Sequence, residues 1–95
     1  IALDPKTMEI VNGGVQEQTK QVMENLKAVL EEASSSFENV LKTTCYLSDM
    51  DNFVAFNEIY GEYFNAQTAP ARSTVAVKTL PKNVLVEVDV IAFKN

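Results

Sequence analysis

The sequence predicts a single α+β domain, spanning residues 1–95, in which two helices cover one face of a β-sheet. A chain of 95 residues, 46% of them hydrophobic, is long enough for one modest core and too short for two. Two segments repeat apolar residues at helical spacing, and three others are rich in β-branched residues. Because an amphipathic helix must bury its apolar side, we expect both helices to pack against the same sheet.

The first helix is predicted over residues 15–33, between a turn at Asn12-Gly13-Gly14 and the serines at positions 34–36. Its apolar positions recur every three or four residues, and charged residues occupy the opposite side. Those apolar positions are Val15, Val22, Leu26, Val29, Leu30 and Ala33, with Thr19 partly included. They define the side of the helix that we expect to face the sheet.

The first strand is predicted over residues 39–47, where β-branched residues are frequent and the two sides alternate. Leu41, Thr43, Cys45 and Leu47 share one side, and we expect that side to be buried. Cys45 is the only cysteine, which excludes an intrachain disulfide and favours a small buried apolar side chain.

The second helix is predicted to follow the segment 48–51, whose serine and aspartates are suited to a helix N-cap, and to end near Asn65. Aromatic residues recur along it at steps of three and four residues, as they do on one side of a helix. They are Phe53, Phe56, Tyr60, Tyr63 and Phe64. A loop restrained by Pro70 follows this helix.

Two further strands are predicted over residues 73–77 and 84–93, joined by a link that contains Pro81 and Asn83. In the last strand Val84, Val86, Val88 and Val90 share one side, which we expect to lie under the helices. The other side carries Leu85, Glu87, Asp89, Ile91 and Phe93. Its mixture of apolar residues with two carboxylates predicts a subunit interface that contains a polar site.

The composition argues against several classes of function. A net charge of −5, from 13 acidic and 8 basic residues, disfavours binding to a nucleic-acid backbone. Because the chain has no histidine, it lacks the common zinc sites and a histidine general base. The sequence shows no membrane-span pattern and no signal-peptide pattern. Together with the single cysteine, these observations predict a cytoplasmic protein that binds neither nucleic acid nor a membrane.

Arg72 is the strongest candidate for a binding residue, because it stands just before the strand predicted over residues 73–77. Its planar guanidinium can bind a carboxylate through two hydrogen bonds. The alternative is an ordinary surface arginine paired with a nearby acid.

Glu87 interrupts an apolar strand, and it is either a general base for a water molecule or the partner that neutralises a buried cation. Spacing alone leaves both alternatives open.

Short motifs spread over the whole chain also carry a resemblance. They are Asp4-Pro5-Lys6-Thr7, Val40-Leu41-Lys42-Thr43-Thr44, Asp51-Asn52-Phe53, Asn57-Glu58-Ile59-Tyr60, Pro70-Ala71-Arg72-Ser73, Leu80-Pro81-Lys82 and Val86-Glu87-Val88. Together they resemble the RidA family, also called YjgF/YER057c/UK114. The resemblance implies a chorismate-mutase-like mixed sheet and a homotrimer with pockets between its subunits. It also implies further N-terminal strands, including a Gly-Pro-Tyr segment that gives a tyrosine to the pocket, so we expect this sequence to be N-terminally incomplete relative to the family.

The resemblance further implies a deaminase that hydrolyses reactive 2-imino acids, such as 2-iminobutanoate and 2-iminopropanoate, to 2-keto acids and ammonia without a cofactor. Arg72 matches the family's arginine for the substrate carboxylate, and Glu87 would position or deprotonate a water molecule. Phe53 and Asn57 match pocket positions, although core packing and solvation are their alternative roles. Thr74 stands where many relatives carry cysteine, so that it would offer only a hydroxyl or backbone contact.

A second hypothesis is a non-catalytic trimer that binds a small carboxylate or hydrophobic ligand and acts as a regulatory or chaperone-like partner of another protein. Turnover of an imino acid would distinguish the enzyme from this binding module. RNA cleavage, which is claimed for some relatives, has little physical support here because the chain is acidic and has no basic aromatic patch.

Overall fold

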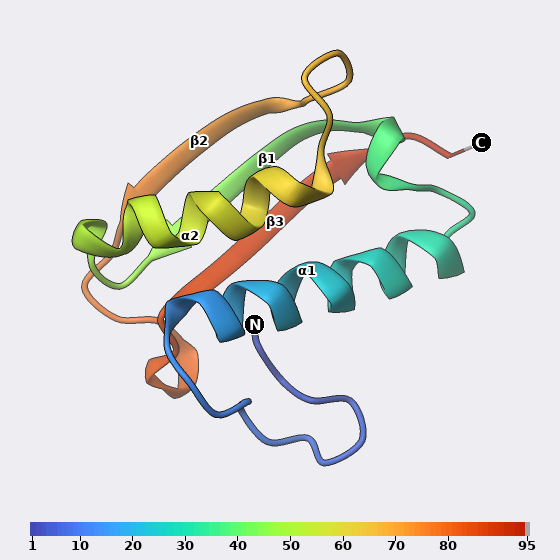
Figure 1. The fold of residues 1–95 in the computed structure, drawn as a ribbon. Coiled ribbons are helices and arrows are strands. Elements are labelled where there is room, and N and C mark those ends of the chain that lie inside the picture. Colours follow the sequence, from blue (N-terminus) through green and yellow to red (C-terminus); the bar gives the residue numbers. More distant parts are fainter. Residues whose placement is uncertain (95) are drawn as a thin grey trace.

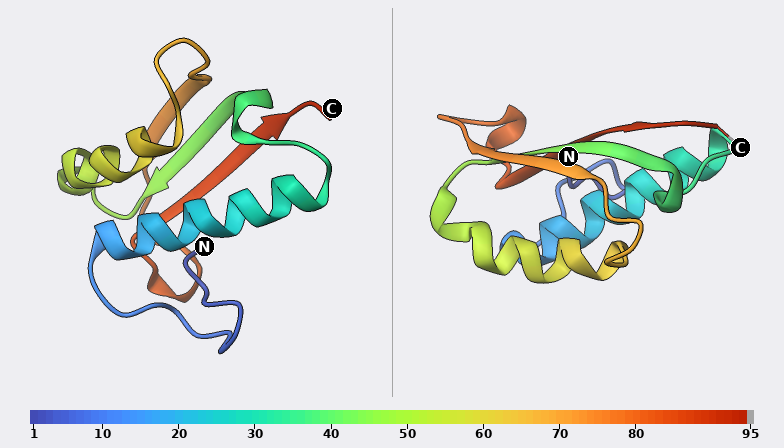
Figure 2. Two further views of the ribbon diagram at one scale, coloured as in Figure 1. Left: turned by 45° about the vertical axis from the view of Figure 1, so that its right-hand side comes forward. Right: turned by 90° about the horizontal axis from the view of Figure 1, so that it is seen from above.

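The computed structural model describes residues 1–94 as a three-stranded sheet with two α-helices packed on one of its faces (Figure 1). The α-helices are α1 (Val15–Glu32) and α2 (Phe53–Tyr60), and the strands are β1 (Val40–Leu47), β2 (Ala71–Ala76) and β3 (Val86–Ala92). Viewed from above, both helices lie on the same side of the sheet (Figure 2). The predicted α+β arrangement, with two helices on a mixed sheet, is confirmed.

Strand β1 is the centre of the sheet, since the strand order is β2-β1-β3. It pairs with β2 in parallel and with β3 in antiparallel orientation. A parallel neighbour requires a crossover connection, and α2 supplies it between β1 and β2. Strand β2, which carries Arg72, therefore lies at one edge of the described sheet, and its α2 connection runs over the helix-covered face.

The core lies between the sheet and the two helices, and its largest fully buried side chain is Phe56 of α2. As predicted, Val86 and Val88 of β3 face this core, and Cys45 and Leu47 of β1 are fully buried there. Burial raises the pKa of the Cys45 thiol, which agrees with its predicted role as a small buried side chain.

The predicted burial of Leu41 is wrong, because its side chain is 58% exposed while Val40 is buried. The pairing of β1 with β3 shifts register between Val40 and Lys42. Such a bulge inserts one extra residue and reverses the side to which the preceding side chain points. The alternation seen from Thr43 onward therefore does not extend back through Leu41.

Helix α1 also differs in detail from its prediction. Val29, assigned to the buried side, is 62% exposed, whereas Met23 is fully buried and was not among the predicted core positions. The helix begins after Gly13, whose φ of 112° favours glycine over any residue with a side chain.

Helix α2 is shorter than predicted, because it passes at Gly61 into a 3₁₀ turn over Gly61–Tyr63. The predicted cap before it is present in a modified form. The Asp49 carboxylate accepts a hydrogen bond of 2.9 Å from the backbone N–H of Asp51, which starts a 3₁₀ turn leading into α2.

The N-terminal segment packs beside α1 and contributes to the core. Its Ala2 is fully buried, and Leu3 and Ile10 form an isolated antiparallel bridge. The Asn25 amide of α1 donates to the Leu3 carbonyl at 2.8 Å and so fixes this segment to the helix. Within residues 1–94, no helix has the length and apolar character needed to cross a bilayer.

The second face of the sheet is left uncovered by both helices (Figure 2). Because side chains alternate along a strand, the residues that alternate with the core-facing valines of β3 point to this open face. Among them Ile91 is 63% exposed. Val75 of β2 pairs with Tyr46 of β1 on the same face, and Val75 is also exposed. The predicted mixture of apolar residues and carboxylates on one side of β3 is thus present at the open face of the described chain.

Candidate functional site

Arg72 lies on the helix-covered face of the sheet, because its register partner on β1 is the buried Thr43. Its Nη1 donates a hydrogen bond to the Asn57 side-chain oxygen of α2. Its Cζ lies 5.3 Å from the centre of the Phe53 ring and 4.8 Å from that of Tyr60. These distances are within cation–π range, so three side chains of α2 together hold one guanidinium.

Helix geometry explains why α2 can present these three side chains together. Phe53, Asn57 and Tyr60 stand four and three residues apart, and such positions lie on one side of a helix. The structure thus brings together Arg72 and two of the predicted binding residues. Tyr60 was predicted only as one of the aromatic residues that recur along the second helix, and its spacing from Asn57 is the signal that could have placed it beside the arginine.

Arg72 borders two open hollows. The first, of about 520 Å³, is lined by Met50, Phe53, Val54, Arg72 and Thr74. The second, of about 510 Å³, is lined by Asn57, Tyr60, Gly61, Phe64, Asn65, Ala66, Ala69, Pro70 and Arg72. The exposed Met50 and Val54 give the first hollow an apolar wall beside the positive charge. This combination suits a small carboxylate that also carries an apolar group.

Thr74 lies two residues after Arg72 on the same side of β2. Its hydroxyl oxygen is buried and makes no hydrogen bond of normal geometry among residues 1–94, although it lies close enough to the Cys45 thiol to oppose the rise that burial causes in the pKa of that thiol. An unpaired buried hydroxyl is unfavourable, so a ligand that hydrogen-bonds to it would gain affinity. The first hollow is therefore lined by one cation and by a threonine whose hydroxyl is buried in its wall.

Glu87 is the predicted site residue that one chain does not bring to Arg72. It pairs with Tyr46 across the sheet and lies between the buried Val86 and Val88, so it points to the open face. Loss of hydration, followed by the charges of Asp89 and Glu87, raises the pKa of Tyr46 on that face. Arg72 and Glu87 of the same chain are therefore on opposite faces of the sheet.

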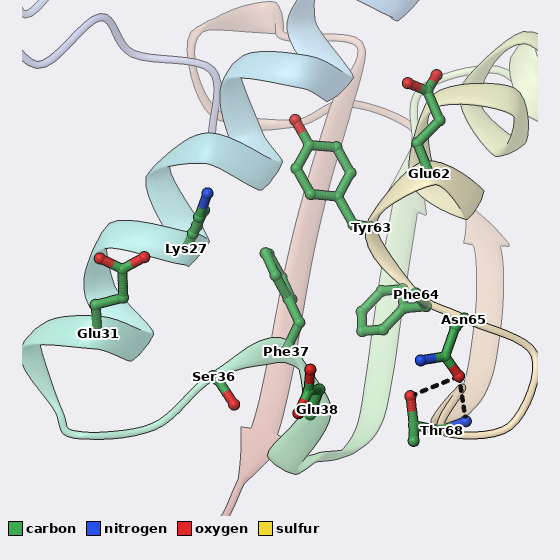
Figure 3. Close-up of a pocket in the computed structure, with 10 residues that line it drawn as sticks. All are labelled: Lys27, Glu31, Ser36, Phe37, Glu38, Glu62, Tyr63, Phe64, Asn65 and Thr68. Carbon is green, nitrogen blue, oxygen red and sulfur yellow. Dashed lines mark hydrogen bonds between the residues drawn. The ribbon is translucent and has the colours of Figure 1, made fainter.

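A third hollow, of about 430 Å³, lies between α1 and the segment after α2 (Figure 3). It contains none of the predicted site residues. Phe37 projects into its centre and contacts the Tyr63 and Phe64 rings at centroid distances of 5.5 and 5.3 Å. Phe64 also lines the second hollow, so its ring forms part of the wall between the two.

Tyr63 should ionise well above the usual range for a phenol. Burial, followed by the hydrogen bond that its hydroxyl donates to the Glu24 carboxylate at 2.8 Å, raises the pKa of Tyr63 to about 12. The resulting stability is present below pH 10, the ordinary phenol pKa, and is lost as pH rises through 12. The titration of Tyr63 is obtained by following tyrosinate absorbance against pH and subtracting the curve of Tyr63→Phe from that of wild type. The difference should show one step near pH 12, and Glu24→Gln should move that step to a lower pH. A step at the ordinary value in wild type would contradict the hydrogen bond.

Comparison with known proteins supports the assignment of a family. Residues 1–94 match the family described as "Endoribonuclease L-PSP". The "RutC family protein slr0709" of Synechocystis sp. is 59% identical over 93 residues, which are 97% of this chain and 72% of that protein.

Two solved structures extend the similarity to the fold. RidA from an Antarctic Psychrobacter is 37% identical with a TM-score of 0.91, over 97% of this chain and 73% of that one. TdcF of E. coli, whose structure contains bound serine, is 36% identical with a TM-score of 0.90, over 100% of this chain and 76% of that one. The chain thus spans about three quarters of the length of these relatives. It belongs to the YjgF/RidA family, whose members are also named RutC and endoribonuclease L-PSP.

Proposed function

We propose that this protein hydrolyses reactive 2-imino acids, such as 2-iminobutanoate and 2-iminopropanoate, to 2-keto acids and ammonia. The observation that carries the proposal is the Arg72 guanidinium, held by Asn57 and by the rings of Phe53 and Tyr60 beside two hollows. Family membership supports it, and so does the serine bound to TdcF, which has the α-carboxylate that an imino acid also carries.

Arg72 would bind the substrate carboxylate. Since Nη1 is directed to Asn57, the remaining N–H groups of the guanidinium, which have no hydrogen bond to residues 1–94, would donate to two carboxylate oxygens. Phe53 and the apolar wall of the first hollow would receive the substrate side chain, and the Thr74 hydroxyl would hydrogen-bond to a polar atom of the substrate. Fixing the carboxylate orients the adjacent imine carbon toward a water molecule.

The position of Glu87 on the opposite face leads us to propose a site shared between subunits. Arg72 is exposed on the edge strand β2, where a second copy can approach it. A copy that packed its open sheet face beside this edge would bring its own Glu87 toward the first hollow. Repeated around a threefold axis, the contact gives a homotrimer with a chorismate-mutase-like arrangement of sheets, and it covers the exposed Ile91 and Val75.

The chemistry requires only addition of water and loss of ammonia. As the water oxygen bonds to the imine carbon, Glu87 would accept a proton from that water, the C=N electron pair would pass to nitrogen, and Glu87 would return the proton to nitrogen. In the second step the new hydroxyl group would lose its proton, which Glu87 would pass to the nitrogen, the carbon–nitrogen bond would break, and ammonia would leave the keto acid. Imine and water thus give keto acid and ammonia without a metal, a redox partner or a cofactor.

A binding module is the second candidate, because the TdcF structure contains serine, which has no imine to hydrolyse. In that case the same Arg72 hollow would bind a small amino or keto acid, and the assembly would act on another protein. The two candidates share one site and differ in turnover.

The experiment is to generate 2-iminobutanoate in situ with an amino-acid dehydratase and to measure release of 2-oxobutanoate and ammonia. We expect the protein to accelerate release beyond the spontaneous rate, in proportion to its concentration. Binding of 2-oxobutanoate, measured by calorimetry, provides the comparison. Binding without acceleration would reject the deaminase in favour of the binding module, and neither binding nor acceleration would reject both.

A further inference from the structure

The Tyr60 hydroxyl and the Thr43 hydroxyl share a hydrogen bond of 2.7 Å beneath the Arg72 guanidinium. Thr43 is fully buried and Tyr60 is 6% exposed, so water cannot readily replace either partner. A hydrogen bond between two buried hydroxyls is therefore costly to break from one side only. It fixes the depth and the tilt at which the phenol ring enters the space under β2.

The three residues form a closed set of contacts. Thr43 is the register partner of Arg72 on the neighbouring strand, and its hydroxyl is hydrogen-bonded to that of Tyr60. The centre of the Tyr60 ring in turn lies 4.8 Å from Cζ of Arg72. The Phe56 and Phe64 rings pack against the Tyr60 ring at centroid distances of 5.4 and 5.0 Å. The ring thus has a fixed place, and Tyr60 is not among the residues that line the first hollow, where the substrate side chain would lie.

We propose that Tyr60 and Thr43 act as positioning residues that set the orientation of the Arg72 guanidinium for carboxylate binding. The inference deepens the proposed function, since it rests on Arg72 as the carboxylate anchor. Asn57 fixes one end of the guanidinium through Nη1, and the Tyr60 ring supports its plane. A planar fork that binds two oxygens loses affinity when its plane can rotate, because both hydrogen bonds depend on its direction.

The phenol is neutral in this role. Burial raises the pKa of Tyr60, although the Thr43 hydrogen bond opposes that change. The ring therefore offers an uncharged aromatic face to the cation at neutral pH, and the hydroxyl serves only to hold the ring.

The test uses Tyr60→Phe, Thr43→Val and the double variant, with 2-oxobutanoate as the binding probe. Each single variant keeps the shape of the side chain and removes one hydroxyl. We expect each variant to raise both the dissociation constant of the probe and KM about threefold to tenfold, the usual effect of losing one hydrogen bond. The double variant should bind as weakly as either single variant, because all three lack the same hydrogen bond.

Stability distinguishes a positioning role from a purely structural one. Each single variant leaves one buried hydroxyl unpaired, whereas the double variant leaves none and should recover part of the lost stability. If affinity recovers together with stability, the positioning role is refuted. Tyr63→Phe is the matched control, because it removes a phenol oxygen that bonds to Glu24 instead, and its affinity for the probe should be unchanged.

A second readout does not depend on the proposed function. Nuclear magnetic resonance of the Arg72 side-chain N–H groups should show restricted rotation in wild type and in Tyr63→Phe. The two single variants and the double variant should show faster rotation. If wild type does not bind 2-oxobutanoate, the proposed function fails, and rotation still decides the positioning role: equal rotation in wild type and in the Tyr60 and Thr43 variants would overturn it.

Discussion

Replacing Arg72 with alanine should lower kcat/KM for 2-iminobutanoate by about two to three orders of magnitude, because two charge-assisted hydrogen bonds to the carboxylate are lost. Arg72→Lys keeps the charge but not the planar fork, and its activity should fall between those of wild type and the alanine variant. The thermal midpoint should change little in both, since Arg72 is exposed and lies outside the core. Lys78→Ala is the control, because it removes an exposed positive charge after the end of β2 without lining either hollow.

The same variant tests whether the site is shared between subunits. Arg72→Ala and Glu87→Gln should each be nearly inactive alone. In trimers assembled from equal amounts of the two, about a quarter of the interfaces would pair an intact arginine with an intact glutamate from the neighbouring chain. Activity should recover to about that fraction of wild type on mixing and reassembly. Once mixed trimers have formed, a mixture as inactive as its components would refute the shared site, because it would mean that both residues must act from one chain.

Side-chain periodicity predicted the faces of the elements wherever the backbone is regular. Val86 and Val88 of β3 and every second residue from Thr43 to Leu47 of β1 are buried as expected, because strict alternation holds along paired strands. It failed at Leu41, where a bulge shifts the register by one residue, and a single sequence gives no local sign of that bulge. The exposure of Val29 also escapes prediction, since the side of an α-helix that a neighbour covers depends on how the helix lies on the sheet.

The candidate site was predictable in part for a similar reason. Helical spacing indicates that Phe53 and Asn57 share one side of α2, and the structure places both against Arg72. The contact between α2 and β2 that makes the site is set by tertiary packing, and the sequence alone does not reveal it. Alternation with Val86 and Val88 already places Glu87 on the side of its strand away from the helices, but the side on which Arg72 lies follows only from the register of β2 on β1.

Replacing Phe56 with alanine should destabilise the protein by about 3–5 kcal/mol, the usual cost of deleting a buried phenylalanine ring. Phe56 is the largest fully buried side chain, and its ring packs between Phe53 and Tyr60 at centroid distances of 6.5 and 5.4 Å. No polar group replaces the ring, so the cost combines lost apolar burial with a cavity between α2 and the sheet. For a domain of this size the thermal midpoint should fall by at least about 12 °C.

Val54→Ala is the matched control, since Val54 lies on the same helix, is 69% exposed and should change stability by less than about 0.5 kcal/mol. Denaturation should be measured at several protein concentrations, because assembly into a trimer would add concentration-dependent stability to the intrinsic stability of the fold. A midpoint for Phe56→Ala within a few degrees of the control, at every concentration, would contradict the buried position of Phe56. The same loss should also loosen Tyr60, so at temperatures where Phe56→Ala remains folded we expect weaker carboxylate binding through the same contact with Arg72.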